Sequence, residues 1–152
     1  MRAASVVLAL LLALTGCAGA GGDDLDGAEE DLGGMGVPQQ LDGEEYPGPR
    51  GDLTVRLVLA GNGCFLGTTA QEPEPRLLVW PRGTEQGDHG DELRLPGGAI
   101  VRHGDVLSGR GLLLPTDRLP AVAEDGYWAY AVGFCTPDAA TVLVLDRAVP
   151  RS

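Results

Sequence analysis

Apolar and polar residues alternate along residues 52–60, which is the pattern of a half-buried β-strand. In the segment DLTVRLVLA, every second residue from Leu53 to Leu59 is apolar and is expected to face a core. Further short apolar runs follow between Gly, Pro and Asp residues: RLLVW, ELRL, AIVR, DVL, GLLL, YWAYAVGF and TVLVLD. Short strands at this spacing predict an all-β domain, either a small barrel or a sandwich.

Turn sequences separate these runs. LPGGA at residues 95–99 and RHGD at residues 102–105 predict two hairpin turns, and Gly109 and Gly111 are expected to mark a bend or bulge in a barrel strand. No segment shows ten residues of helical periodicity. Residues 127–134 are therefore expected to form a strand, with these side chains on its core face: Trp128, Tyr130, Val132 and Phe134.

The first sixteen residues have a different pattern. Arg2 is followed by twelve uncharged, mostly aliphatic residues and then by small residues, which is the layout of a secretory signal peptide. A single-pass membrane anchor is the alternative, but it needs roughly 20 apolar residues and would have to include Thr15, Gly16 and Gly19.

The residues Leu14-Thr15-Gly16-Cys17 resemble the lipobox of bacterial lipoproteins. This resemblance implies cleavage just before Cys17 and attachment of a diacylglycerol to its sulfur, often with acylation of the new amino terminus. Two or more acyl chains give stable anchoring, so the mature protein is expected on the extracytoplasmic face of the bacterial cell membrane.

Lipidation of Cys17 would leave two of the three cysteines, Cys64 and Cys135. Exported proteins meet an oxidising environment, so we expect a disulfide between them that joins an early strand segment to the YWAYAVGF segment. A metal pair or a reactive thiol is the alternative, although neither cysteine has a Cys-x-x-Cys partner or a nearby set of His ligands.

Residues 17–50 contain nine acidic residues, one Arg and nine glycines. They show almost no periodic pattern of apolar residues. Such a segment is expected to be a disordered tether, because it cannot bury enough surface to offset its ordering entropy. The acids lack the spacing of a calcium loop. The three expected parts are a signal peptide (1–16), a lipidated tether (17–50) and a β-domain (51–152).

The chain has 11 basic and 22 acidic residues and a net charge of −11, with no Lys. An acidic chain without a basic stripe argues against nucleic acid as a partner.

Within residues 63–114, VWPRGTE followed by LRLPGGAIVRHGDVLSGRG resembles small domains of uncharacterised lipoproteins from GC-rich Gram-positive bacteria. This resemblance implies an OB-like barrel.

Candidate catalytic residues are few. Ser108, His103 and Asp105 could be written as a triad, but they lie within six residues on one turn, where strand alternation does not bring them together. The loop residues Asp88, His89, Asp91 and Glu92 could hold a metal ion, although a solvated loop is the favoured interpretation because only one imidazole is present. No cofactor is expected.

Trp80 and Arg82 form the candidate binding pair, because an exposed indole beside a guanidinium could stack on a sugar or peptide. The favoured alternative is that Trp80 closes the end of the barrel. The sequence thus predicts a non-enzymatic envelope module, anchored through Cys17, with a protein, peptide or glycan partner. The alternative is an extracytoplasmic enzyme with a loop site near His89 and His103.

Overall fold

The computed structural model describes residues 36–123 and 125–151. The predicted signal peptide, the lipobox with Cys17 and the tether as far as residue 35 lie outside these residues. The elements follow one another as β1 (Gly51–Leu59), β2 (Phe65–Thr68), β3 (Arg76–Val79), β4 (Glu85–Gln86), β5 (Glu92–Arg94), β6 (Ile100–Arg102), β7 (Val106–Pro115), the 3₁₀-helix η1 (Thr116–Arg118), α1 (Tyr127–Cys135) and β8 (Thr141–Pro150).

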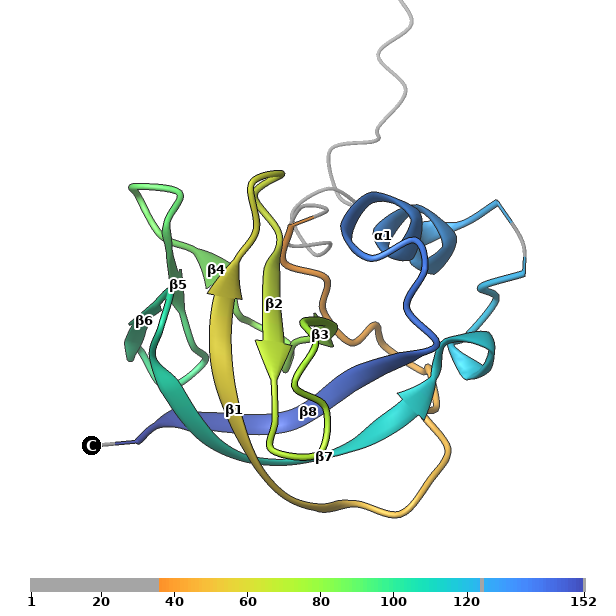
Figure 1. The fold of residues 1–152 in the computed structure, drawn as a ribbon, viewed down its shortest axis with the longest axis horizontal. Helices are drawn as coiled ribbons and strands as arrows, with labels where there is room; N and C mark the ends of the chain where they lie inside the picture. The colour runs from red at the N-terminus through yellow and green to blue at the C-terminus, as the bar shows by residue number, and fades with distance from the viewer. Residues whose placement is uncertain (1–35, 124, 152) are drawn as a thin grey trace, which may run out of the picture.

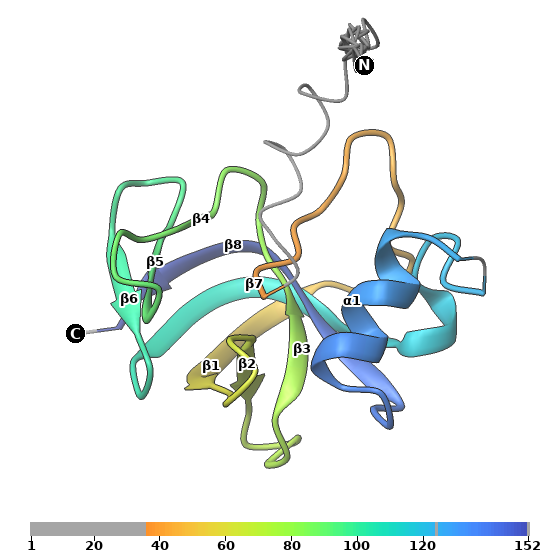
Figure 2. The same ribbon diagram turned by 90° about the horizontal axis from the view of Figure 1, so that it is seen from above.

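Five strands close into a barrel in the order β1-β2-β3-β8-β7, with β7 pairing back to β1 (Figure 1). β3 and β8 run parallel, and the other barrel pairs are antiparallel. The predicted all-β barrel is therefore confirmed and the sandwich alternative is wrong. β4, β5 and β6 form a separate sheet, which lies on one side of the barrel while α1 lies on the other (Figure 2).

The two predicted turns are present. The amide of Leu95 donates to the carbonyl of Ala99 at 2.8 Å in the hairpin between β5 and β6. The amide of Asp105 donates to the carbonyl of Arg102 at 3.1 Å between β6 and β7. Gly98 and Gly104 have φ angles of 82° and 89°, which side chains other than glycine rarely adopt.

The parallel pair of β3 and β8 is buried on both faces. Leu78 and Leu143 pack inside the barrel with Val55 of β1, whereas Val79 and Val144 pack on the outer side, in the cluster that α1 covers. A strand covered on both faces has no solvent side on which polar residues could alternate. This explains why both strands are nearly continuous apolar runs, RLLV and TVLVL.

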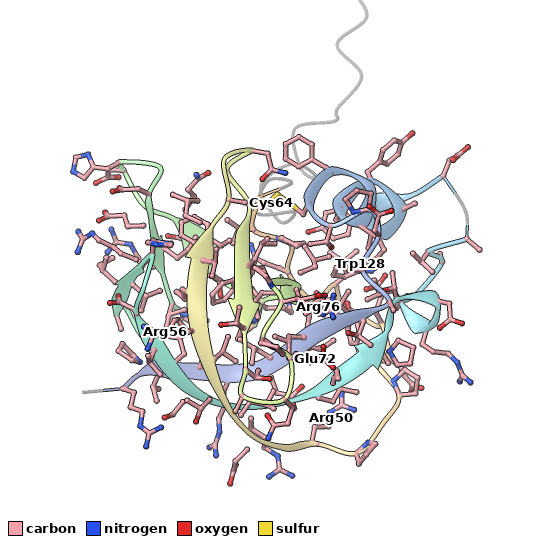
Figure 3. The ribbon with its side chains drawn as sticks, in the orientation of Figure 1. Arg50, Arg56, Cys64, Glu72, Arg76 and Trp128 are labelled. Atoms are coloured by element: carbon pink, nitrogen blue, oxygen red, sulfur yellow. A yellow bond between two sulfur atoms is a disulfide. The ribbon has the colours of Figure 1, made fainter. Side chains whose placement is uncertain are left out.

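Residues 127–135 form α1, so the prediction of a strand here is wrong. The buried side chains recur at helical spacing: Trp128, Ala131, Val132 and Cys135. Trp128 lies between the helix and the barrel (Figure 3), whereas Tyr130 and Phe134 are 62% and 43% exposed. Apolar residues occupy every side of this short helix, so strand alternation and helical spacing fit the same sequence.

The folded part begins before residue 51. Val37 and Tyr46 are buried, and the ring of Tyr46 packs edge to face on Trp128 with centroids 5.8 Å apart. The amide of Trp80 donates to the carbonyl of Pro38 at 2.8 Å, and the amide of Gln40 donates to the carbonyl of Trp80 at 3.0 Å. The prediction of a disordered tether is therefore wrong for residues 36–50, where a few apolar side chains suffice to cover the end of β3.

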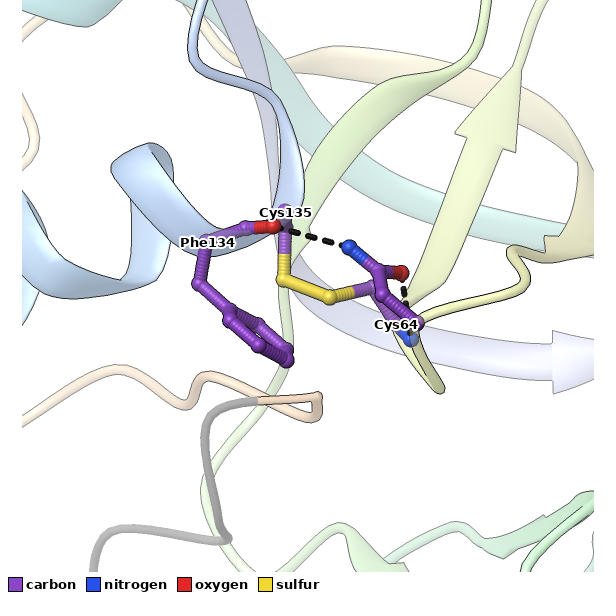
Figure 4. The surroundings of a disulfide bond; sticks show 4 residues. Cys64, Phe134 and Cys135 are labelled. Carbon is purple, nitrogen blue, oxygen red and sulfur yellow. Dashed lines mark hydrogen bonds between the residues drawn. A yellow bond between two sulfur atoms is a disulfide. The ribbon is translucent and has the colours of Figure 1, made fainter.

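The predicted disulfide joins Cys64 to Cys135 (Figure 4). Cys64 precedes β2 and Cys135 ends α1, so the bond attaches the β1–β2 turn to the helix and not to a strand. Asn62 reinforces the junction, because its Nδ2 donates to the carbonyl of Phe134 at 2.8 Å.

Candidate functional site

The residues of the possible triad are engaged in other contacts. His103 Nδ1 accepts a hydrogen bond from the amide of Leu59 at 3.0 Å, and Asp105 Oδ2 accepts one from the amide of Arg102 at 2.8 Å. Both side chains therefore hold the turn that leads into β7. Ser108 lies on β7 opposite Thr54 of β1. The structure does not assemble these three side chains into a triad.

The loop of Asp88, His89, Asp91 and Glu92 is divided between solvent and core. His89 is exposed, whereas Glu92 is buried and forms an ion pair with Arg102. A shallow hollow of about 420 Å³ is lined by Leu59, Asp91, Arg102 and His103, without His89. Within residues 36–123 and 125–151, no three His, Cys, Asp or Glu side chains gather as a metal site.

Trp80 is fully buried, so the prediction of an exposed stacking residue is wrong. It packs with the barrel core, and its backbone forms hydrogen bonds with Pro38 and Gln40; the alternative in which it closes the barrel end stays a prediction. Arg82 is partly exposed and forms an ion pair with Asp42. The two residues do not form a shared binding surface.

A β-bulge in β8 changes which side chains lie on the outside of the barrel. Arg110 pairs with Arg147, and the next residue, Gly111, pairs with Leu145, so Asp146 is the extra residue. Leu145 consequently packs inside the barrel while Arg147 lies on the outer face beside Arg110. Strict alternation would have placed Leu145 and Arg147 on the same face.

Three adjacent strands, β1, β7 and β8, present an outer surface with a regular array of polar side chains. Cross-strand partners share a face, so the register places these residues in rows. The rows are Asp52, Arg110 and Arg147; Thr54, Ser108 and Val149; and Arg56, Val106 and Arg151. We call Arg56, Arg110, Arg147 and Arg151 the arginine face.

The arginine face includes one acid, because Asp52 is the cross-strand partner of Arg110, but no ion pair joins them. Five arginines in the described part pair with carboxylates: Arg50, Arg76, Arg82, Arg94 and Arg102. None of the four arginines on the face forms such a pair within the described residues. Arg56 donates to the carbonyl of Gly104 at 2.9 Å, and Arg151 donates to Thr54 Oγ1 at 3.4 Å. Asp146, the nearest acid in sequence to Arg147, pairs instead with Arg50 at 3.3 Å.

A shallow hollow of about 560 Å³ lies on this surface. Its lining residues come from the three strands and the segment after β8: Asp52, Leu53, Thr54, Ser108, Gly109, Arg147, Val149 and Arg151. Guanidinium and hydroxyl groups together can donate hydrogen bonds to the oxygens of an anion. The arrangement is therefore suited to binding a negatively charged group.

The sequence analysis missed the arginine face. The available signal was the position of Arg56 in β1 between the apolar residues Val55 and Leu57, whereas Arg110 in β7 lies between two glycines. The position of Arg147, however, depends on the bulge, and the approach of the three strands depends on register.

Comparison with protein-family models, curated proteins and solved structures finds no match to this chain. No helix among the described residues has the length and apolar character needed to cross a membrane.

Proposed function

We propose that this protein is a lipid-anchored module of the bacterial cell envelope that binds a partner without transforming it. The lipobox resemblance at Leu14–Cys17 supports the anchor and the extracytoplasmic location. The single observation that carries the binding role is the arginine face, four arginines that form no ion pair within the described residues, on a chain whose net charge is −11.

The arginine face places like charges side by side. Arg110 and Arg147 lie directly opposite each other, which is unfavourable in a sheet, and Asp52 on the other side of Arg110 is not joined to it by an ion pair. An anionic ligand would relieve this repulsion. This supports a role in binding over a role in stabilising the fold.

The alternative function is an extracytoplasmic enzyme that uses the hollow beside His103. The grouping of Asp91, Arg102 and His103 favours it. Against it, the Nδ1 atom of His103 already accepts a hydrogen bond from Leu59, so that ring nitrogen is occupied by a structural contact. We therefore favour the binding module.

The anchor is tested by mass spectrometry of protein extracted from membranes. We expect acyl mass on an N-terminal peptide that begins at Cys17, and we expect Cys17→Ala to abolish it. A mature protein that retains Met1 would contradict the proposed anchoring.

The binding role is tested by mixing the detergent-extracted, full-length protein with isolated cell envelopes. We expect the protein to sediment with the envelopes, to be released by added salt, and to leave the envelope polymers chemically unchanged. His89→Ala, in an exposed loop, should behave like the wild type. Release of soluble products that stops in a folded His103→Ala variant would instead establish the enzyme.

A further inference from the structure

We propose that the outer face of β1, β7 and β8 binds a polymer in which phosphate groups are joined through hydroxylated units such as polyols or sugars. This names the ligand class of the binding module and rests on that proposed function. The arginine face and the hollow between its arginines carry the inference.

The opposed arginines favour phosphate over carboxylate. Arg110 and Arg147 are direct cross-strand partners, so their two guanidinium groups can reach one anion. A phosphate within such a polymer is a diester, whose two non-bridging oxygens diverge from a tetrahedral phosphorus and can each accept hydrogen bonds from a different guanidinium, whereas the two oxygens of a planar carboxylate match the fork of a single arginine. The binding of one phosphate would also offset the repulsion between the two side chains.

A second pair of arginines, Arg56 and Arg151, lies two rows away from the first. Arg151 lies just after β8 and follows Arg147 by four residues, which corresponds to about 13 Å in an extended chain, and both line the hollow. The amide of Arg151 donates to the carbonyl of Val106 at 2.8 Å, and Val106 is the cross-strand partner of Arg56. Positive charge is therefore concentrated at two separated ends, which fits a repeating anion better than a single phosphate.

The residues between the two arginine pairs are uncharged. Thr54 and Ser108 are direct partners and place two hydroxyl groups there, beside the exposed side chain of Val149. Hydroxyl groups both donate and accept hydrogen bonds, so they match the hydroxylated unit that joins two phosphates.

The face carries no aromatic side chain among its described residues, whose rows contain only Arg, Asp, Thr, Ser and Val. Proteins that bind single-stranded nucleic acid stack bases on aromatic rings. The absence of aromatic rings on the arginine face therefore favours a phosphate polymer without nucleobases over a single-stranded nucleic acid.

The chain enters the described part away from this face. The carbonyl of Gly36 accepts a hydrogen bond from the amide of Phe65 at 3.0 Å, beside the β1–β2 turn, whereas the arginine face lies on the first half of β1 (Figure 1). The described chain thus joins the barrel at a different place, and vesicles are included in the test below to distinguish a membrane from a polymer.

The test uses the full-length, lipidated protein in uncharged detergent and a fluorescently labelled oligomer of glycerol phosphate as the probe. Binding is measured by fluorescence anisotropy at low and at physiological salt. We expect salt-sensitive binding that is at least about tenfold weaker in Arg110→Gln/Arg147→Gln, because two charge-assisted contacts are lost. Arg118→Gln, which removes an exposed arginine of η1 without a described carboxylate partner, is the matched control and should bind like the wild type.

Three other anions identify the chemistry that is recognised. Oligoglutamate of equal charge, oligothymidylate and vesicles containing phosphatidylglycerol should each bind more weakly than the glycerol phosphate oligomer. Equal or tighter binding of any of them would overturn the proposed ligand class. Equal loss of binding in Arg118→Gln and in the double variant would show general charge attraction and would also overturn it.

The same samples separate the failure of this inference from the failure of the proposed function. Chromatography of the probe after incubation reports its length. A probe that is shortened by the protein would contradict the non-catalytic function, whereas a probe that stays intact and unbound would overturn only the ligand assignment. Thermal unfolding of each variant at or above the temperature of the wild type confirms that the fold is retained.

Discussion

Glycine at position 111 allows β7 and β8 to approach closely where the bulge occurs. A Cβ atom built on Gly111 would overlap the carbonyl oxygen of Val144, and one on Gly109 would lie 2.5 Å from the carbonyl oxygen of Arg147. Both obstacles are backbone atoms, which cannot move without disturbing the ladder. The bulge that turns Arg147 outward therefore depends on the absence of side chains at these two positions.

Gly111→Ala is expected to destabilise the protein by about 1–3 kcal/mol, the usual cost of overpacking a close-packed site. Gly51→Ala is the matched control, because Gly51 is the cross-strand partner of Gly111 and a Cβ there meets nothing within 4 Å. Urea unfolding of the two variants measures the difference. Equal midpoints would contradict the proposed role of Gly111.

The Glu44 carboxylate joins the N-terminal segment to α1, because it accepts hydrogen bonds from both Tyr46 and Trp128. The hydroxyl of Tyr46 donates to Glu44 Oε2 at 2.6 Å, and Trp128 Nε1 donates to the same oxygen at 2.9 Å. Burial is the main cause that raises the pKa of Tyr46 far above its usual value, and the Glu44 carboxylate raises it further. The folded state therefore opposes ionisation of this hydroxyl.

Stability is consequently expected to fall as the pH rises above about 10, the unfolded pKa of tyrosine, by up to about 1.4 kcal/mol per pH unit for this group. Below that pH the contribution is fully present. Tyr46→Phe should make the alkaline decline shallower, although burial also raises the pKa of Tyr127, which remains. Unfolding in urea across alkaline pH measures the slope, with Tyr130→Phe on the exposed side of α1 as the control. Identical slopes in wild type and Tyr46→Phe would refute this expectation.

Among the elements, α1 depends on the disulfide for its attachment to the β1–β2 turn. The bond spans 71 positions along the chain, and in the chain-entropy model a closed loop of this size stabilises by roughly 4 kcal/mol. We expect Cys64→Ala/Cys135→Ala to lose about 2–4 kcal/mol of unfolding free energy. A reducing agent should lower the urea midpoint of the wild type and leave that of the double variant unchanged. A wild-type midpoint that does not respond to reduction would show that the bond contributes little.

Local pattern predicts some elements of this fold and misses others for physical reasons. β1 has one face in solvent, so its alternation is visible in the sequence, whereas β3 and β8 are recognisable as apolar runs without any sign of their parallel pairing. β4 consists of Glu85 and Gln86, both exposed, and has no apolar pattern to detect. α1 is apolar on every side, and its nine residues are too few to distinguish the two periods.

At the scale of the whole molecule, residues 36–50 complete the fold. A chain beginning at Gly51 would leave Trp80 and Trp128 without the cover of Val37 and Tyr46. We expect it to be less stable than a chain beginning at Gly36 by about 3–5 kcal/mol, because two large apolar side chains lose their burial. Urea unfolding of the two chains gives the comparison. Equal urea midpoints would show that residues 36–50 do not stabilise the folded domain and act only as part of the tether.

The arginine face is likewise a property of the whole molecule. Its residues lie far apart in sequence, and only the closure of β1 on β7 and of β7 on β8 brings them together. Sequence pattern could indicate that Arg56 faces solvent, but register and one extra residue in β8 decide that the four arginines meet.

The position of β8 determines when the barrel can form. β8 pairs with β3 on one side and β7 on the other, so the ring of strands stays open until residues 141–150 are available. Contacts between distant parts of a chain form slowly. The rate of refolding is therefore expected to be limited by the pairing of β8 with β3 and β7. Both disulfide cysteines precede β8, so their bond can form before β8 pairs with β3 and β7. The bond then leaves fewer conformations to be sampled before the barrel closes. If the protein is exported, as proposed above, a polypeptide that cannot close its barrel early would stay unfolded long enough to cross the membrane.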